Sequence, residues 1–198
     1  MEHLTNTIIL LTAFAGTGKY TIGRELAQLT GAKLIDNHLI NNSLFTALNA
    51  DGVTPLPYEI WDKVGRIRDI VYETIRELSP PGLSFIFTMQ LFEDEPMDHG
   101  AFVNLEQLAR DRQSLFAPFR LICDVDELCR RVVNPQRAER MKQIDMESAR
   151  RRALTKQLLN PTHPNIRTLD VTSTKPLESA KLILKEIETM KERDRSPA

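Results

Sequence analysis

The sequence predicts one α/β domain built on a five-stranded parallel sheet with helices on both faces. Short apolar runs alternate along the chain with longer segments of helical periodicity, which is typical of repeated strand–helix–strand units. The run Ile8-Ile9-Leu10-Leu11 is continuous rather than alternating, as expected for a strand that is covered on both faces. A chain of 198 residues is long enough to bury one such core.

The first part of the chain supplies two strands and the helix between them. A strand is expected over residues 7–12. A helix is expected from Lys19 to Leu29, because apolar residues recur there at helical spacing and Gly31 follows as a C-cap. Residues 33–35 are expected to form a short second strand that ends at Asp36.

The middle of the chain supplies two helices and the third strand. Residues 38–48 are expected to be helical. A long amphipathic helix follows Pro57, with an apolar face from Ile60 to Leu78, and Pro80 ends it. The third strand is expected over residues 83–88.

The last part of the chain continues the alternation. Apolar residues between 105 and 115 mark another helix, and a fourth strand over residues 119–125 leads into a helix over 128–133. A fifth strand is expected over residues 166–171 and a final helix over 177–190. The prediction is therefore a single domain over residues 1–190, followed by a charged tail over residues 191–198.

Composition restricts the class of function. Apolar residues make up 41% and charged residues 27%, and the net charge of −1 gives no reason to expect a nucleic-acid or membrane partner. No apolar run approaches the ~20 residues that span a bilayer. Cys123 and Cys129 stand without further cysteine or histidine ligands nearby, so we expect neither a disulfide nor a zinc site. A cytoplasmic protein is the expectation.

Residues 13–21, Ala-Phe-Ala-Gly-Thr-Gly-Lys-Tyr-Thr, form the most informative segment. They join a buried strand to a helix and follow the phosphate-loop pattern G-x-x-x-x-G-K-[ST], in which backbone amides surround a polyphosphate and the lysine reaches the β- and γ-phosphates. The match is incomplete, because Ala13 replaces the first glycine and Tyr20 replaces the hydroxyl that would ligate Mg²⁺. The residues expected to bind ATP are Ala15, Gly16, Thr17, Gly18, Lys19, Tyr20 and Thr21.

The loop, the five-strand pattern and a basic segment between the last two strands resemble the small P-loop kinases. This group includes nucleoside-monophosphate kinases, shikimate kinases and antibiotic phosphotransferases. The resemblance implies ATP and Mg²⁺ as cofactors, a small-molecule acceptor, and an arginine-rich lid over about residues 134–160. It identifies no single family: the segment Thr88-Met89-Gln90-Leu91 lacks the Asp-Gly-Phe-Pro-Arg-like run of nucleoside-monophosphate kinases, and the aspartate pair and triple glycine of shikimate kinases are absent.

Asp36 stands at the end of the second strand, at the sheet edge where open α/β proteins bind ligands. By the resemblance, it acts as a base for the acceptor hydroxyl or holds Mg²⁺, with Thr21 as the other metal candidate. The alternative is a helix N-cap, and one residue can do both. His38, Asn41 and Asn42 lie three and four residues apart on the next helix, which predicts either a substrate-binding face or a solvated one.

Residues 130–156 contain nine Lys or Arg residues against three acidic residues. By the resemblance, Arg137 and Arg140 close over the transferring phosphate, because planar guanidinium groups suit charge spread over phosphoryl oxygens. The alternative is a helix with a solvated basic surface. The roles of the other basic residues are left open.

The sequence thus favours a kinase that transfers the γ-phosphoryl group of ATP to a hydroxyl of a small metabolite or drug. Lys19, Asp36, Arg137 and Arg140 are the expected catalytic residues. Tyr20 favours the alternative, a nucleotide-binding switch or interaction module with weak or no transfer. A nucleic-acid end kinase is disfavoured by the near-neutral net charge. The apolar face around Trp61 leaves a homodimer open.

Overall fold

The computed structural model describes residues 3–195 and places five strands in one parallel sheet in the order β2–β3–β1–β4–β5. This confirms the predicted fold class and sheet. The strands are β1 (Thr7–Thr12), β2 (Lys33–Asp36), β3 (Phe85–Met89), β4 (Leu115–Ile122) and β5 (Arg167–Asp170).

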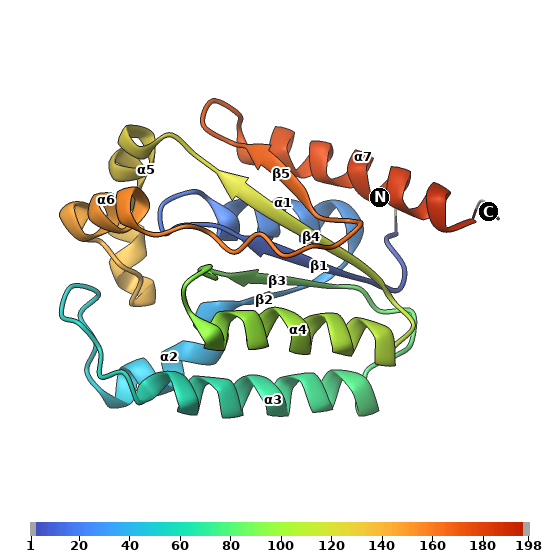
Figure 1. Cartoon of the computed structure of the whole chain (residues 1–198), viewed down its shortest axis with the longest axis horizontal. Coiled ribbons are helices and arrows are strands. Elements are labelled where there is room, and N and C mark those ends of the chain that lie inside the picture. The colour runs from blue at the N-terminus through green and yellow to red at the C-terminus, as the bar shows by residue number, and fades with distance from the viewer. Residues whose placement is uncertain (1–2, 196–198) are drawn as a thin grey trace.

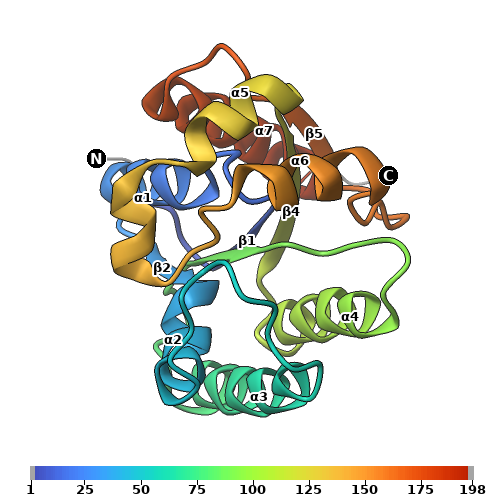
Figure 2. The ribbon, with the colours of Figure 1, turned by 90° about the vertical axis from the view of Figure 1, so that its left-hand side faces the viewer.

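Helices cover both faces of the sheet and its carboxyl edge (Figure 1). The pair α1 and α7 packs on one face, and the pair α3 and α4 packs on the other. The short helices α5, η1 and α6 gather near the carboxyl ends of the strands (Figures 1 and 2). The helices are α1 (Lys19–Thr30), α2 (Asn37–Ala47), α3 (Ile60–Leu78), α4 (Pro96–Asp111), α5 (Val125–Val132), η1 (Pro135–Arg140), α6 (Met146–Thr155) and α7 (Pro176–Arg195).

The central strand β1 explains why its sequence is apolar at every position. Ile8 and Leu10 belong to the core under α3 and α4, whereas Ile9 and Leu11 belong to the core under α1 and α7. All four side chains are fully buried. Burial on both faces thus requires the continuous apolar run that the sequence shows.

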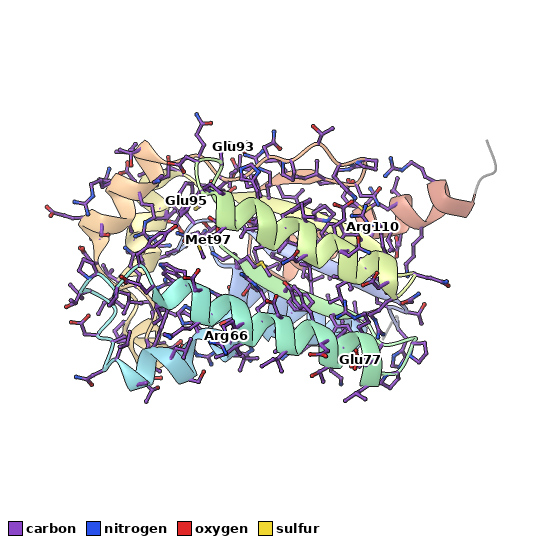
Figure 3. The ribbon with its side chains drawn as sticks, turned by 60° about the horizontal axis from the view of Figure 1, so that its bottom comes forward. Arg66, Glu77, Glu93, Glu95, Met97 and Arg110 are labelled. Atoms are coloured by element: carbon purple, nitrogen blue, oxygen red, sulfur yellow. The ribbon has the colours of Figure 1, made fainter. Side chains whose placement is uncertain are left out.

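The long helix α3 has the bounds that the prolines predict, and it lies beside α4 on one face of the sheet. Figure 3 looks onto this pair, with Glu95 and Arg110 near opposite ends of α4 and Glu77 near the end of α3. Tyr72 and Ile75 of α3 contribute to the core on this side. Trp61 is 37% exposed and its ring packs edge-on against Phe45 of α2, with 6.1 Å between the ring centroids.

The predicted position of the fourth strand was wrong. β4 begins at Leu115, which pairs with Thr7, and the helix before it ends at Asp111 rather than running to Leu115. The change of direction occurs at Gln113, whose φ of 53° is in the left-handed region and cannot continue a helix. Asp124 consequently lies beyond the strand. It caps α5, because its carboxylate accepts hydrogen bonds from the backbone amides of residues 126 and 127.

The last helix is longer than the sequence indicated. α7 continues past Met190 to Arg195, and the rest of the predicted tail lies outside the described residues. Ala180, Ile183 and Ile187 bury its apolar side against the sheet. Within residues 3–195, no helix combines the length and apolar character that a membrane span requires.

Candidate functional site

The loop between β1 and α1 depends on two glycines in the left-handed region. Gly16 has φ 90° and Gly18 has φ 111°. A Cβ atom on Gly16 would lie 2.7 Å from the carbonyl oxygen of Leu128 in α5. These two positions therefore require glycine, which alone adopts this backbone without strain.

Within residues 3–195, the N-terminus of α1 carries no capping side chain. Its first-turn amides have no partners inside the helix, no acidic residue lies in the first turn, and no side chain among the described residues caps it. The helix dipole adds positive potential at the same point. The loop thus places two left-handed glycines directly before an uncapped helix N-terminus.

Lys19 extends back over the loop rather than into solvent. Its Nζ donates to the carbonyl oxygens of Ala13 at 2.7 Å and of Phe14 at 2.9 Å. Burial and the nearby charge of Arg137 lower the pKa of Lys19 from 10.5 to about 7, although the charge of Asp36 acts in the opposite direction. An anion bound at this loop would replace the carbonyl partners and favour the charged form of the amine.

Asp36 occupies the N-cap position of α2, but its carboxylate does not cap the helix. Thr88 at the end of β3 donates to Asp36 Oδ1 at 2.5 Å, and Lys142 Nζ donates to Oδ2 at 2.8 Å. Asp36 is 4% exposed and Lys142 is 7% exposed, so the ion pair is buried. Burial acts to raise the pKa of Asp36, but Lys142 and Thr88 outweigh it and hold the pKa below its usual value.

Lys142 reaches this position through a sharp turn after η1. Met141 has φ 52°, and this left-handed residue reverses the chain so that Lys142 points toward β2. The sequence reasoning missed Lys142, because it is one of nine basic residues in its segment. The available signal was Asp36 itself, since a carboxylate buried at the end of an apolar strand requires a cationic partner.

Tyr20 lies under basic side chains from the segment between β4 and β5. The guanidinium carbon of Arg140 is 4.1 Å from the centre of the Tyr20 ring, and Lys142 Nζ is 4.4 Å from it. The guanidinium of Arg24 is 5.9 Å from the same ring. Cation–π contacts of this kind contribute about 0.5–2 kcal/mol each, depending on how far the cation is desolvated.

Arg137 also lies at the loop. Its Nε donates to the carbonyl oxygen of Gln143 at 3.1 Å, and burial lowers its pKa, partly offset by the charge of Asp36. The structure therefore brings Lys19, Asp36, Arg137 and Arg140 together around one point. Three of these four side chains are cationic, and Lys142 adds a fourth cation.

The three polar residues of α2 predicted to bind substrate, His38, Asn41 and Asn42, do not share one surface. His38 Nδ1 lies 3.0 Å from Asn42 Oδ1, and Asn42 donates to the carbonyl oxygen of Arg140 at 3.4 Å. Burial and the charge of Lys142 lower the pKa of His38 to about 4, so this imidazole is neutral at pH 7. Asn41 instead lines a small cavity between α2, α3 and β3, together with Arg68 and Thr88.

Comparison with solved structures assigns the fold. No protein-family model and no curated protein matches the sequence. A gluconokinase from Sinorhizobium meliloti 1021 aligns with a TM-score of 0.63 and 13% identity over 97% of each chain. The APS kinase of Mycobacterium tuberculosis, solved with AMPPNP and APS, aligns with a TM-score of 0.57 and 15% identity over 93% of this chain and 98% of that one.

This is the fold of the small P-loop kinases. A shikimate kinase from Acinetobacter baumannii also aligns, with a TM-score of 0.51 and 18% identity over 95% of this chain and 96% of that one. At these identities the likeness concerns the fold alone. The predicted resemblance to small P-loop kinases is thereby confirmed at the level of architecture.

P-loop nucleotide-binding proteins commonly hold Mg²⁺ with the hydroxyl that follows the loop lysine and with a nearby carboxylate. Here Tyr20 follows Lys19, and the hydroxyl of Thr21 donates to Gly18 O at 2.8 Å from an exposed position. The oxygen of Thr17 is covered by protein. The carboxylate of Asp36 is paired with the ammonium group of Lys142. The residues at this loop therefore do not fit a magnesium site of the usual kind.

The other acidic residues near the carboxyl edge of the sheet have partners of their own. Glu93 accepts the backbone amide of Asn160, and Lys156 pairs with Asp94 and Glu95. These contacts hold the loop before α4 against the chain that follows α6. Asp36 differs from these residues because its ion pair is with Lys142, in the basic segment after η1.

Proposed function

We propose that the protein is an ATP-dependent kinase that phosphorylates a hydroxyl group of a small molecule. The observation that carries this proposal is the convergence of the loop lysine Lys19, the carboxylate of Asp36 and the cations of residues 137–142 at one sheet edge. The fold supports it, since aligned structures include a gluconokinase, an APS kinase and a shikimate kinase.

The donor side is the loop. Backbone amides of residues 15–21 and the ammonium group of Lys19 bind the β- and γ-phosphates of ATP. Arg137 and Arg140, from the segment between α5 and α6, stabilise charge on the transferring group. The segment that carries them, residues 134–160, acts as a lid, and AMPPNP bound to the aligned APS kinase supports ATP as the ligand.

The acceptor side is Asp36 together with the polar residues of α2. The acceptor hydroxyl oxygen forms a bond to the γ-phosphorus while the bond from that phosphorus to the β–γ bridging oxygen breaks. ADP leaves, and the hydroxyl proton passes to the carboxylate of Asp36. This transfer demands positioning more than basicity, so a carboxylate of low pKa suffices. His38, Asn41 and Asn42 bind further polar groups of the acceptor.

The test separates binding from turnover. ATP affinity is measured by calorimetry, and ADP release is followed over hydroxylated metabolites, nucleosides and aminoglycoside-like drugs. We expect Lys19→Ala to lose ATP binding, and Asp36→Asn to keep ATP binding but lose ADP release with the true acceptor. The matched control is Asp69→Asn, at an exposed site on α3.

Two outcomes decide against the proposal. An unchanged ATP affinity in Lys19→Ala would show that the loop is not the donor site. Tight ATP binding without acceptor-dependent ADP release would instead favour a nucleotide-binding switch. Tyr20 and the occupied carboxylate of Asp36 are the observations that keep this second function in the test.

A further inference from the structure

The ammonium group of Lys142 lies between two groups that border the metal in other P-loop proteins. One is the residue directly after the loop lysine, and the other is a carboxylate at the carboxyl edge of the sheet. Here both contact the same side chain: Lys142 Nζ is 4.4 Å from the centre of the Tyr20 ring and 2.8 Å from Asp36 Oδ2.

The ring of Tyr20 suits a cation on a side chain better than a free metal ion. A neutral phenol is a poor ligand for Mg²⁺, which prefers carboxylate, phosphate and water oxygens. The face of an aromatic ring, in contrast, stabilises an ammonium or guanidinium group. Tyr20 has two such partners within 4.4 Å, Arg140 and Lys142.

The charges are also unbalanced in favour of an anionic ligand. Lys19, Arg137, Arg140 and Lys142 surround the loop, and Asp36 is the single carboxylate that contacts any of them in the described part of the chain. Lys142 is buried and Lys19 and Arg137 are half-buried, so an anion that neutralises their charge is favoured at this point. A polyphosphate supplies that charge without a divalent cation.

We infer that Lys142 takes the place of the divalent cation, so that the site binds ATP free of Mg²⁺. On ATP binding, the ammonium group of Lys142 contacts phosphoryl oxygens while the ring of Tyr20 remains beneath it. This inference rests on the proposed kinase function. The flexible four-carbon side chain of lysine permits the movement from Asp36 toward the phosphates. Asp36 is then released to accept a hydrogen bond from the acceptor hydroxyl.

The experiment measures the affinity for ATP twice, in excess EDTA and in excess MgCl₂. We expect the wild-type protein to bind ATP in EDTA as tightly as in MgCl₂, within about threefold. Lys142→Gln should lose ~10- to 100-fold in EDTA, the effect of removing one charge-assisted hydrogen bond, and should recover part of the loss in MgCl₂. Lys185→Gln, at an exposed site on α7, is the matched control and should resemble the wild type.

Removing Lys142 alone leaves Asp36 buried without its cation, which threatens folding. The double variant Lys142→Gln/Asp36→Asn avoids this problem, and its ATP affinity should show the same sensitivity to EDTA. Tyr20→Ser gives an independent measurement. Because a hydroxyl returns to the metal-ligating position, its ATP affinity should become higher in MgCl₂ than in EDTA.

Three results would overturn the inference. The first is a wild-type affinity at least ~10-fold weaker in EDTA, which would leave the proposed kinase function intact. The second is an affinity in EDTA that does not change when Lys142 is replaced in either background. The third is the absence of ATP binding in both solutions, which would overturn the proposed function as well.

Discussion

The ammonium group of Lys19 is poised between two protonation states. Burial and the charge of Arg137 bring its pKa to about 7, whereas a free lysine titrates at 10.5. The unfolded chain therefore binds more protons than the folded one between pH 7 and pH 10.5. It follows that Lys19 lowers the free energy of unfolding below pH 7, and that this penalty is relieved as the pH rises toward 10.5.

The same pKa predicts how ATP affinity depends on pH. Because only the charged amine pairs with phosphate, we expect the affinity to fall by about tenfold per pH unit above pH 7. In Lys19→Arg the guanidinium group stays charged, so its affinity should be nearly constant between pH 7 and pH 9. Calorimetric titrations at several pH values measure both slopes. Equal slopes in the two proteins would contradict the assignment to Lys19.

At the scale of elements, the segment from η1 to α6 is held against the rest of the protein by close backbone contact. Gly52, in the connection between α2 and α3, has φ 79°, and a Cβ atom there would lie 2.7 Å from the carbonyl oxygen of Lys142. Thr46 and Asn42 of α2 contact Met141 and Arg140 of the same segment. The docked position of Lys142 thus depends on a glycine far from it in sequence.

We therefore expect Gly52→Ala to lower the free energy of unfolding by about 1–3 kcal/mol, from backbone strain and from displacement of Lys142. The matched control is Gly100→Ala in α4, where no atom lies within 4 Å of the added Cβ and no positive φ is involved. Because alanine favours a helix more than glycine does, Gly100→Ala should raise the free energy of unfolding by about 0.5–1 kcal/mol. Urea unfolding measures both, and destabilisation by both variants alike would count against a specific contact at Gly52.

The sequence determines elements best where local signals and burial agree. Pro57 and Pro80 bracket α3, and the buried run of β1 has the same bounds in prediction and structure. β4 was misplaced because Leu115 continues the helical spacing of α4, whereas its tertiary contact is with Thr7 of β1. Pairing between strands distant in sequence cannot be seen in a local pattern.

The site was predictable only where its residues follow a recognisable local pattern. The loop residues and Asp36 are recognisable because the end of a parallel strand has a defined position in the fold. Lys142 is placed by the left-handed turn at Met141 and by contact with Gly52, which is distant in sequence, and no local pattern indicates either feature. The division of Asn41 from Asn42 depends on how α2 packs between α3 and residues 140–141.

At the scale of the whole molecule, the carboxyl edge of the sheet joins two groups of helices. Figure 2 shows α2 and α3 below β1 and α5 and α6 above it, and residues 135–143 lie in the chain between α5 and α6. Their shared contacts include the buried pair of Asp36 and Lys142, the hydrogen bond from Asn42 to Arg140, and the packing of Gly52 on Lys142. None of these contacts is a hydrogen bond between two backbone groups, so the junction is expected to open more readily than the sheet.

ATP should close this junction, because the phosphates attract cations from both sides of it. We expect amides in residues 135–143 to exchange at least ~10-fold more slowly with ATP bound, whereas amides of β1, already fully buried, should not change. In Lys142→Gln the slowing should be much smaller, and in Lys185→Gln it should match the wild type. Hydrogen exchange followed by mass spectrometry resolves these segments. Protection of the loop at residues 13–19 without protection of 135–143 would show that nucleotide binding is local, and that the basic segment does not act as a lid.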